Sequence, residues 1–284
     1  MVQKYDGLKV KSPGTVIISA SGHCNDIRKI VKPVLNKNSG DLYYVNLSFD
    51  EYKLGGSSFA QTLNKVGSDS PEIKDPVKFK ESFNLVQNLI YKNNILSGHD
   101  ISSGGLITCL LEMCFSSNDI GLDINLSNLG CSDSSKLLFS ENSGIIIQSN
   151  KDLEKEFSSI DVKCSRIGNT NNKGVLNIKN FENSFSFNIN KYRDIWYSTS
   201  KDFDLKQTKN NKAIERFNNY KNQPLEYIFP NGFNGNDISN NSDKKIKAAI
   251  IREKGSNSER EMAYMISLAG FDVKDIHMTD FYNY

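Results

Sequence analysis

The chain has 284 residues, 38% of them hydrophobic, and its 35 basic and 33 acidic side chains leave a net charge of +2. This length favours one large domain or two smaller ones, and the near balance of charge argues against nucleic acid or an acidic membrane as a partner. No apolar run in the sequence is long enough to span a bilayer, and the first residues lack the apolar core of a signal peptide. We therefore expect a cytoplasmic protein.

The five cysteines are an odd number and show no C-x-x-C spacing. Such a count is typical of reduced thiols in a cytosolic protein and argues against a zinc site. We expect Cys109 and Cys114 to lie in the core as small hydrophobic residues.

The first half of the chain predicts alternating strands and helices. Residues 15–18 are β-branched and predict a buried strand, residues 42–47 predict a second strand, and LGGSS at 54–58 begins a helix that runs to about Val66. Asp75 followed by Pro76 is a typical helix start, because Asp caps free amides and Pro fits the first turn. The apolar face of that helix consists of Phe79, Phe83, Val86, Leu89 and Ile90.

A short strand at 95–96 then leads into GHDISSGG at 98–105 and a strongly apolar helix, which we expect at the centre of the domain. Further strands are predicted at 120–126, 144–148, 162–167, 175–178 and 185–189, with a short polar helix at 151–159 and two polar helical stretches after residue 190. This mixture predicts an α/β layered domain.

Residues 221–244 read as a linker, rich in Pro, Gly, Asn and Ser. The pattern then restarts with a strand at 248–251, a polar loop, a helix at 259–269 that Gly270 ends, and a strand at 271–278. This is one βαβ unit of a parallel sheet. Because one such unit cannot bury both faces of its sheet, we expect it to begin a further domain.

The sequence at 98–105 carries the parts of a phosphate–metal site. It places the Asp100 carboxylate, the hydroxyls of Ser102 and Ser103 and two glycines at the mouth of a helix, where free amides and the helix dipole attract anions and a carboxylate can hold a hard cation. The alternative is an ordinary helix cap. His99 fits a hydrogen-bonding scaffold better than a general base.

Two other positions leave alternatives open. Glu141 is either a second carboxylate of the same cleft or a solvated side chain at a helix end. The glycine pair at 55–56 suits either a close approach of the backbone to a substrate or a tight start to the helix.

Several motifs, in this order, resemble the large single-chain formylglycinamidine ribonucleotide synthases of purine biosynthesis. They are LGGSSFAQ at 54–61, HDISSGGL at 99–106, LFSE at 138–141, WYSTS at 196–200, IREKGSNSEREM at 251–262, FDV at 271–273 and IHMTD at 276–280. The similarity runs from about residue 14 to the end. The order of the motifs is more specific than any one of them, since D-x-S-x-G-G also occurs in related kinases and synthetases.

The resemblance implies the fold and the domains. It implies a C-type domain like that of aminoimidazole ribonucleotide synthase at 1–200, a helical and linker segment at 201–244, and at 245–284 the first βαβ unit of a flavodoxin-like class I glutamine amidotransferase domain. In the family, ATP activates formylglycinamide ribonucleotide and ammonia from glutamine displaces the phosphate. The chain is then expected to be a fragment of a carbon–nitrogen ligase that uses ATP, glutamine and this ribonucleotide.

The resemblance also assigns roles to residues. It implies that Asp100 binds Mg²⁺ and that Ser102 binds the nucleotide, ATP or ADP. In the large form this nucleotide site is structural and does not turn over. Ser103 stands where many members carry an acidic residue, which removes a charge near the metal. No cysteine follows Cys164, so the cysteine nucleophile of a class I glutaminase is missing and the chain alone is expected to be inactive.

Two other interpretations remain. A free-standing ATP-binding relative, of the selenophosphate synthetase or thiamine monophosphate kinase type, would explain HDISSGG but not the amidotransferase-like end. The second is a non-catalytic domain that serves only as an interaction or assembly module.

Overall fold

The computed structural model describes residues 2–11, 17–22, 26, 28–222, 228, 230–232 and 246–283. The chain divides into two compact units, Met1–Asn222 and Gln223–Tyr284. Within the described residues, no helix is both long and apolar enough to cross a bilayer.

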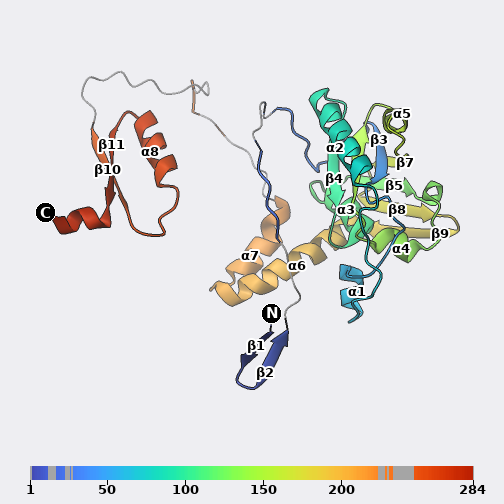
Figure 1. Cartoon of the computed structure of the whole chain (residues 1–284), viewed down its shortest axis with the longest axis horizontal. Helices are drawn as coiled ribbons and strands as arrows, with labels where there is room; N and C mark the ends of the chain where they lie inside the picture. Colours follow the sequence, from blue (N-terminus) through green and yellow to red (C-terminus); the bar gives the residue numbers. More distant parts are fainter. Residues whose placement is uncertain are drawn as a thin grey trace. The chain divides into compact units, whose positions relative to one another are not determined.

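The first unit contains an N-terminal hairpin, a large sheet and seven α-helices among its described residues (Figure 1). Its strands are β1 (Val2–Tyr5), β2 (Leu8–Lys11), β3 (Asp41–Asn46), β4 (Ser97–Ile101), β5 (Gly121–Asn125), β6 (Gly144–Ser149), β7 (Cys164–Asn171), β8 (Val175–Asn180) and β9 (Asn183–Asn188). Its α-helices are α1 (Ser58–Thr62), α2 (Pro76–Tyr91), α3 (Gly105–Phe115), α4 (Ser134–Phe139), α5 (Leu153–Ser158), α6 (Ile189–Gln207) and α7 (Lys212–Asn219), with short 3-10 turns η1 (Ser127–Leu129) and η2 (Tyr220–Asn222).

The large sheet has seven strands in the order β4-β6-β3-β7-β5-β8-β9. Its neighbours are antiparallel except β5 and β8, which run parallel. β4 therefore lies at one edge, hydrogen-bonded to β6 alone among the strands of the sheet. This mixed sheet with packed helices confirms the predicted α/β fold class.

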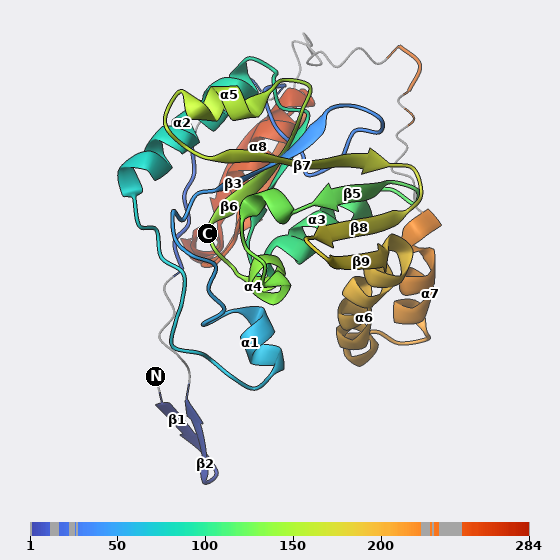
Figure 2. The ribbon, with the colours of Figure 1, turned by 90° about the vertical axis from the view of Figure 1, so that its right-hand side faces the viewer.

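Helices cover both faces of the sheet (Figure 2). Along β3, Leu42 and Tyr44 enter one core with α3, α4 and the start of α6, whereas Tyr43 and Val45 enter another with α2 and α5. Side chains of a strand alternate between faces, so the continuous apolar sequence of β3 buries both sides. The large sheet is therefore packed between two hydrophobic cores, one on each of its faces.

α3 is the most buried of the α-helices described in the first unit. Eight of its residues are buried, among them Cys109 and Cys114 as expected. At its C-terminal end the buried guanidinium of Arg193, from α6, donates to the carbonyl oxygens of Phe115 and Ser117 at 2.9 and 3.3 Å. A cation there complements the helix dipole, and it ties α6 to α3.

Several predicted elements are confirmed. Asp75 caps α2 by accepting the N–H groups of Val77 and Lys78. The strands predicted at 42–47, 120–126, 144–148, 162–167, 175–178 and 185–189 are β3, β5, β6, β7, β8 and β9, with ends shifted by a few residues.

Other predictions were wrong. Ile17 and Ile18 are highly exposed and belong to no described strand, because a β-branched run is buried only where a partner strand meets it; Thr15 and Val16 lie outside the described residues. α1 ends at Thr62 instead of Val66, since Asn64 takes a left-handed conformation with φ of 55°. The strand expected at 95–96 begins at Ser97 and runs to Ile101, so Asp100 lies on β4.

The second unit is one βαβ unit among its described residues. It contains β10 (Lys247–Arg252), α8 (Glu259–Leu268), β11 (Asp272–His277) and the 3-10 turn η3 (Met278–Asn283). β10 and β11 are parallel, with Lys247 opposite Asp272, and Arg252 donates to Asp275 at 2.8 Å across them. Gly270 follows the helix with φ of 92°, as predicted. Most of the linker predicted at 221–244 lies outside the described residues.

Candidate functional site

The sequence motif at 98–105 forms the passage from β4 into α3. Asp100 is the fourth residue of β4, paired with Ile145 of β6. Gly104 and Gly105 take left-handed conformations, with φ of 89° and 74°, and turn the chain into the helix. A Cβ on Gly105 would meet the carbonyl oxygens of Leu138 and Ser140 at 2.7 and 2.8 Å. The second glycine is therefore required by the close approach of the C-terminal end of α4.

The amides at this helix mouth are partly occupied by the protein itself. Gly104 donates its N–H to the Glu141 carboxylate at 2.8 Å, and Gly105 donates to the carbonyl of Ser102 at 3.0 Å. The expectation that the amides of the motif are exposed to an anionic ligand is wrong for these two. A side-chain carboxylate has taken the place that a ligand oxygen would fill.

Glu141 does more than either predicted alternative. The oxygen that accepts Gly104 also accepts the N–H of Ser58, at the start of α1, at 2.7 Å. Glu141 is half-buried, and it joins the first residues of two helices where negative charge is favourable. The three segments of the LGGSS, HDISSGG and LFSE motifs meet at this one carboxylate.

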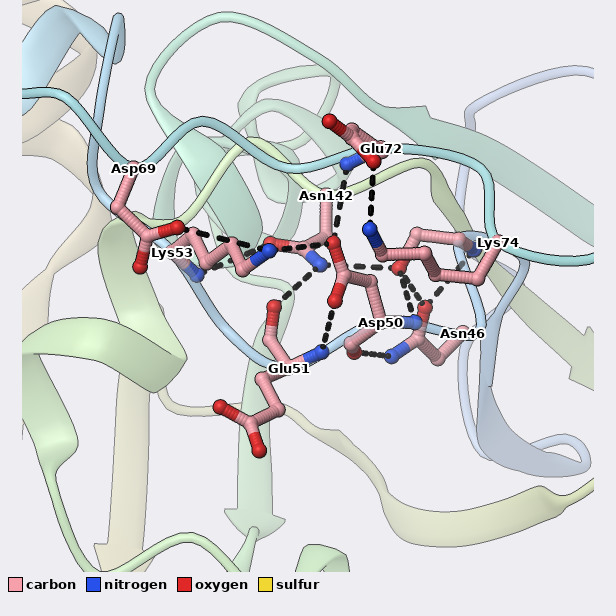
Figure 3. A network of polar contacts seen from close by, with 9 residues as sticks. Asn46, Asp50, Glu51, Lys53, Asp69, Glu72, Lys74 and Asn142 are labelled. Atoms are coloured by element: carbon pink, nitrogen blue, oxygen red, sulfur yellow. Dashed lines mark hydrogen bonds and ion pairs between the residues drawn. The ribbon is translucent and has the colours of Figure 1, made fainter.

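The next residue, Asn142, fixes the loop before α1. Its side chain is 1% exposed; it accepts the N–H of Lys53 at 3.3 Å and donates to the hydroxyl of Ser48 and the carbonyl of Glu51, both at 2.9 Å. Figure 3 shows this amide beside the ion pair of Asp50 and Lys53, whose atoms are 2.9 Å apart. Asn142 and this ion pair therefore fix the loop that precedes LGGSS.

Within LGGSS, the glycines are structural. Gly55 donates to the carbonyl of Asp69 at 2.9 Å, and a Cβ there would meet the Asp69 backbone at 2.5 Å. Gly56 donates to the carbonyl of Val66. Ser57 caps α1 by accepting the N–H of Ala60. A tight start to the helix, the second predicted alternative, describes these contacts.

A pocket of about 300 Å³ lies against this loop. Its lining includes Gly55 and Phe59 together with three lysines, Lys53, Lys65 and Lys136. Phe59 stacks on Phe139 with ring centroids 4.5 Å apart, so α1 packs against the end of α4 beside this pocket. Asp69 brings a carboxylate to the same pocket and lies 3.5 Å from the Lys53 ammonium.

Asp100 and Ser102, the predicted metal and nucleotide residues, lie exposed beside this framework. The Asp100 side chain is 72% exposed, and its Oδ1 lies 3.4 Å from Nδ1 of His99. Ser102 and Ser103 are also exposed. No group of three or more His, Cys, Asp or Glu side chains in the described part of the chain could hold a metal ion. The site therefore offers one carboxylate and hydroxyls to a cation, and no protein cage.

His99 connects the motif to residues that sequence reasoning missed. Its Nδ1 lies 2.7 Å from the carbonyl oxygen of Asp100, to which it can only donate. Its Nε2 lies 3.3 Å from Glu112 of α3, and the other oxygen of Glu112 accepts the indole N–H of Trp196 at 3.0 Å. The signal in the sequence was one acidic residue inside an otherwise apolar helix. The scaffold role predicted for His99 agrees with this geometry.

The thiol of Cys109 lies near the same carboxylates. Burial raises its pKa most, and the negative charges of Asp100 and Glu112 raise it further. Cys109 is therefore a neutral packing residue at neutral pH, in keeping with its place in the core.

Two family models match the chain in order. Residues 42–179 match the AIR synthase related protein, C-terminal domain, and residues 245–284 match the CobB/CobQ-like glutamine amidotransferase domain. Over 99% of its length the chain is 35% identical to the probable phosphoribosylformylglycinamidine synthase, chloroplastic/mitochondrial, of Arabidopsis thaliana, and over 95% of its length it is 32% identical to the Homo sapiens phosphoribosylformylglycinamidine synthase. The chain is therefore similar, over nearly its whole length, to phosphoribosylformylglycinamidine synthases.

This similarity confirms the resemblance seen in the motifs, including that of the amidotransferase-like end, which a free-standing kinase or synthetase leaves unexplained. The chain spans about a fifth of these relatives, 20% and 21% of their lengths. Among solved structures, T. maritima PurL complexed with FGAR is similar over 59% of this chain and 30% of that chain, with 10% identity and a TM-score of 0.46.

Proposed function

We propose that this chain is part of an enzyme that makes formylglycinamidine ribonucleotide from formylglycinamide ribonucleotide, ATP and glutamine, and that its first unit holds nucleotide and Mg²⁺ through Ser102 and Asp100. The relatives' name supports the reaction, and the synthetase-related and amidotransferase matches support the use of ATP and glutamine. The role of the two residues rests on the site itself.

One observation carries the proposal for the site. Glu141 binds the starts of α1 and α3 together, and the exposed Asp100 carboxylate lies beside the start of α3 with no Lys or Arg as an ion-pair partner among the described residues. A dipole favours anions at this end of a helix. Because the N–H groups of Gly104 and Gly105 are already hydrogen-bonded within the protein, a phosphate would approach through the Ser102 hydroxyl, with the Asp100 carboxylate next to it as the second partner of Mg²⁺.

The residues fit Mg²⁺ in a particular way. In nucleotide sites this ion keeps several waters and is held by one or two carboxylates together with phosphate oxygens. Asp100 supplies one such carboxylate, and the Ser102 hydroxyl offers a hydrogen bond to a phosphate oxygen. The bound ion would neutralise phosphate charge, so nucleotide and metal should bind together and neither strongly alone.

The 284 residues should have neither activity of the whole enzyme. Glutamine hydrolysis by the class I route needs a cysteine nucleophile, and no cysteine follows Cys164 in this sequence. Purified chain should release no glutamate from glutamine and form no amidine with ATP. Either activity would overturn the proposal that the chain acts as a supporting part.

Calorimetric titration of the chain with Mg·ATP and Mg·ADP tests the site. Asp100→Ala should weaken binding at least tenfold, because the remaining hydroxyls cannot replace a charged ligand of the ion. Asp202→Ala is a matched control, since Asp202 on α6 is 68% exposed and its ion-pair partner is Lys201; its affinity should equal that of the parent chain. Equal binding by Asp100→Ala would overturn the role of Asp100, and no binding by either protein would favour the non-catalytic interaction module instead.

A further inference from the structure

A connected row of side chains runs from α6 to the candidate metal residue. Trp196 on α6 donates its indole N–H to Oε1 of Glu112 at 3.0 Å, and Oε2 of Glu112 lies 3.3 Å from Nε2 of His99. His99 in turn donates from Nδ1 to the carbonyl oxygen of Asp100 at 2.7 Å. Each of the four residues therefore has a polar contact with the next.

The middle of this row is shielded from water and its two ends are not. The side chains of His99 and Glu112 are 18% and 27% exposed, whereas that of Asp100 is 72% exposed and Trp196 is half-exposed. A partly buried polar contact restricts its groups more than an exposed one. The contacts of His99 and Glu112 are thus the part of the row that constrains geometry.

Asp100 lies where such a constraint has an effect. β4 is an edge strand, paired with β6 alone in the sheet, and the peptide after Asp100 leads into the glycine turn. Holding the Asp100 carbonyl from His99 fixes the rotation of that peptide. The direction of the Asp100 side chain follows from the same backbone.

The far end of the row is anchored to the same helix by other contacts. The Trp196 ring lies 6.0 Å from that of Phe115, the last residue of α3. Three residues before Trp196 in α6, Arg193 binds the carbonyls at the end of α3. The indole is therefore held in place with respect to Glu112, and its N–H fixes which way that carboxylate is turned.

We propose that Trp196, Glu112 and His99 are positioning residues that hold Asp100 for Mg·nucleotide, so that α6 contributes to a site it does not touch. This inference rests on the proposed function and assigns to the three residues a role in affinity. Trp196 is the sole tryptophan of the sequence, so its fluorescence reports on the far end of the row. Binding at Asp100 should change its emission.

The experiment combines calorimetry with tryptophan fluorescence on the 284-residue chain, titrated with Mg·ATP. Glu112→Ala should weaken binding about tenfold, the usual effect of removing a group that orients a metal ligand. Glu112→Gln should stay within about threefold of the parent chain, because its amide keeps an oxygen to accept from the indole and a polar group beside Nε2 of His99. Trp196→Phe keeps the ring contact with Phe115, loses the N–H, and should weaken binding severalfold in calorimetry.

Tyr197→Phe is the matched control, since it alters the next residue of α6 outside the row and should bind as the parent chain does. Far-UV circular dichroism confirms that each variant is folded. The inference is overturned if the parent chain and Tyr197→Phe bind, Asp100→Ala does not, and both Glu112→Ala and Trp196→Phe bind normally. If the parent chain shows no binding heat and no change in emission, the proposed function fails, and this inference fails with it.

Discussion

The Glu141 carboxylate accepts the backbone N–H of Gly104 at 2.8 Å. Its same oxygen accepts the N–H of Ser58 at 2.7 Å, so one side chain holds the starts of α1 and α3. Both contacts are charge-assisted, and both amides belong to helix ends that lack an intrahelical acceptor. The relative position of the LGGSS and HDISSGG segments therefore depends on a residue outside both.

Replacing Glu141 should show how much the fold depends on this link. Glu141→Ala leaves two amides without their acceptor and should lower the free energy of unfolding by about 2 kcal/mol. Glu141→Gln keeps an acceptor without the charge and should lose about half as much. Urea unfolding followed by circular dichroism measures both. Glu182→Ala, in the exposed turn before β9, is the control; a loss no larger than the control's would contradict the structural role.

Two glycines form a matched pair for testing the turn into α3. Gly56 and Gly105 have φ of 75° and 74°, but a Cβ on Gly56 would meet nothing within 4 Å, whereas one on Gly105 would meet backbone at 2.7 Å. Gly56→Ala should cost about 1 kcal/mol for the left-handed conformation alone. Gly105→Ala adds a clash with backbone and should cost about 3 kcal/mol or prevent folding. Equal losses in urea unfolding would show that the C-terminal end of α4 moves aside freely.

The ion pair of Asp50 and Lys53, in the loop before LGGSS, should make the free energy of unfolding depend on pH in the acid range. The hydrogen bond from Lys53 lowers the pKa of the Asp50 carboxyl, against the opposite effect of burial, and the backbone N–H groups of Glu72 and Glu51 lower it further. The folded pKa thus lies below the unfolded value of about 3.9. The stabilisation is fully present above the unfolded pKa and is lost as pH falls through the folded pKa.

Comparison with Asp50→Asn isolates this contribution. The difference in free energy of unfolding between the parent chain and Asp50→Asn should be constant between about pH 5 and pH 7 and should shrink below about pH 4. Urea titrations at intervals through this range give the difference directly. A difference that grows as the pH falls would mean that the carboxylate is destabilising in the fold.

The elements that the sequence predicted well depend on neighbours in the chain. Asp75 caps α2 through amides two and three residues away, and the βαβ unit at 247–277 combines a strand, a helix and a strand that follow directly on one another. Local hydrogen bonds and hydrophobic periodicity depend on residues that are close in sequence, so the sequence alone can predict them. The family motifs were visible for the same reason.

The contacts that shape the candidate site are distant in sequence. Glu141 reaches amides 37 and 83 positions away, and Trp196 reaches Glu112 across 84 positions. Nothing in the residues around Glu141 shows which amides it will meet, so its two predicted roles were both incomplete. The strand predicted at 15–18 was wrong for a related reason, because burial depends on a partner that a local pattern does not contain.

Cysteine labelling tests the burial of α3 independently of any ligand. Cys109, Cys114 and Cys164 are buried, and burial raises the pKa of all three thiols, that of Cys114 to about 12. Cys131 is only half-buried, and Cys24 lies outside the described residues. Since the thiolate is the form that reacts, native chain treated with iodoacetamide at pH 8 should be modified at Cys131 well before the three buried thiols.

Peptide mass spectrometry at successive times gives the order of modification. In concentrated urea all three buried thiols should react at rates similar to that of Cys131, because unfolding removes the burial that suppresses the thiolate. Cys131→Ser should abolish its own early modification and leave the three buried thiols as slow as before. Native labelling of Cys114 as fast as that of Cys131 would show that α3 opens to solvent, and a helix that opens could not hold Glu112 and the start of the motif in the arrangement described.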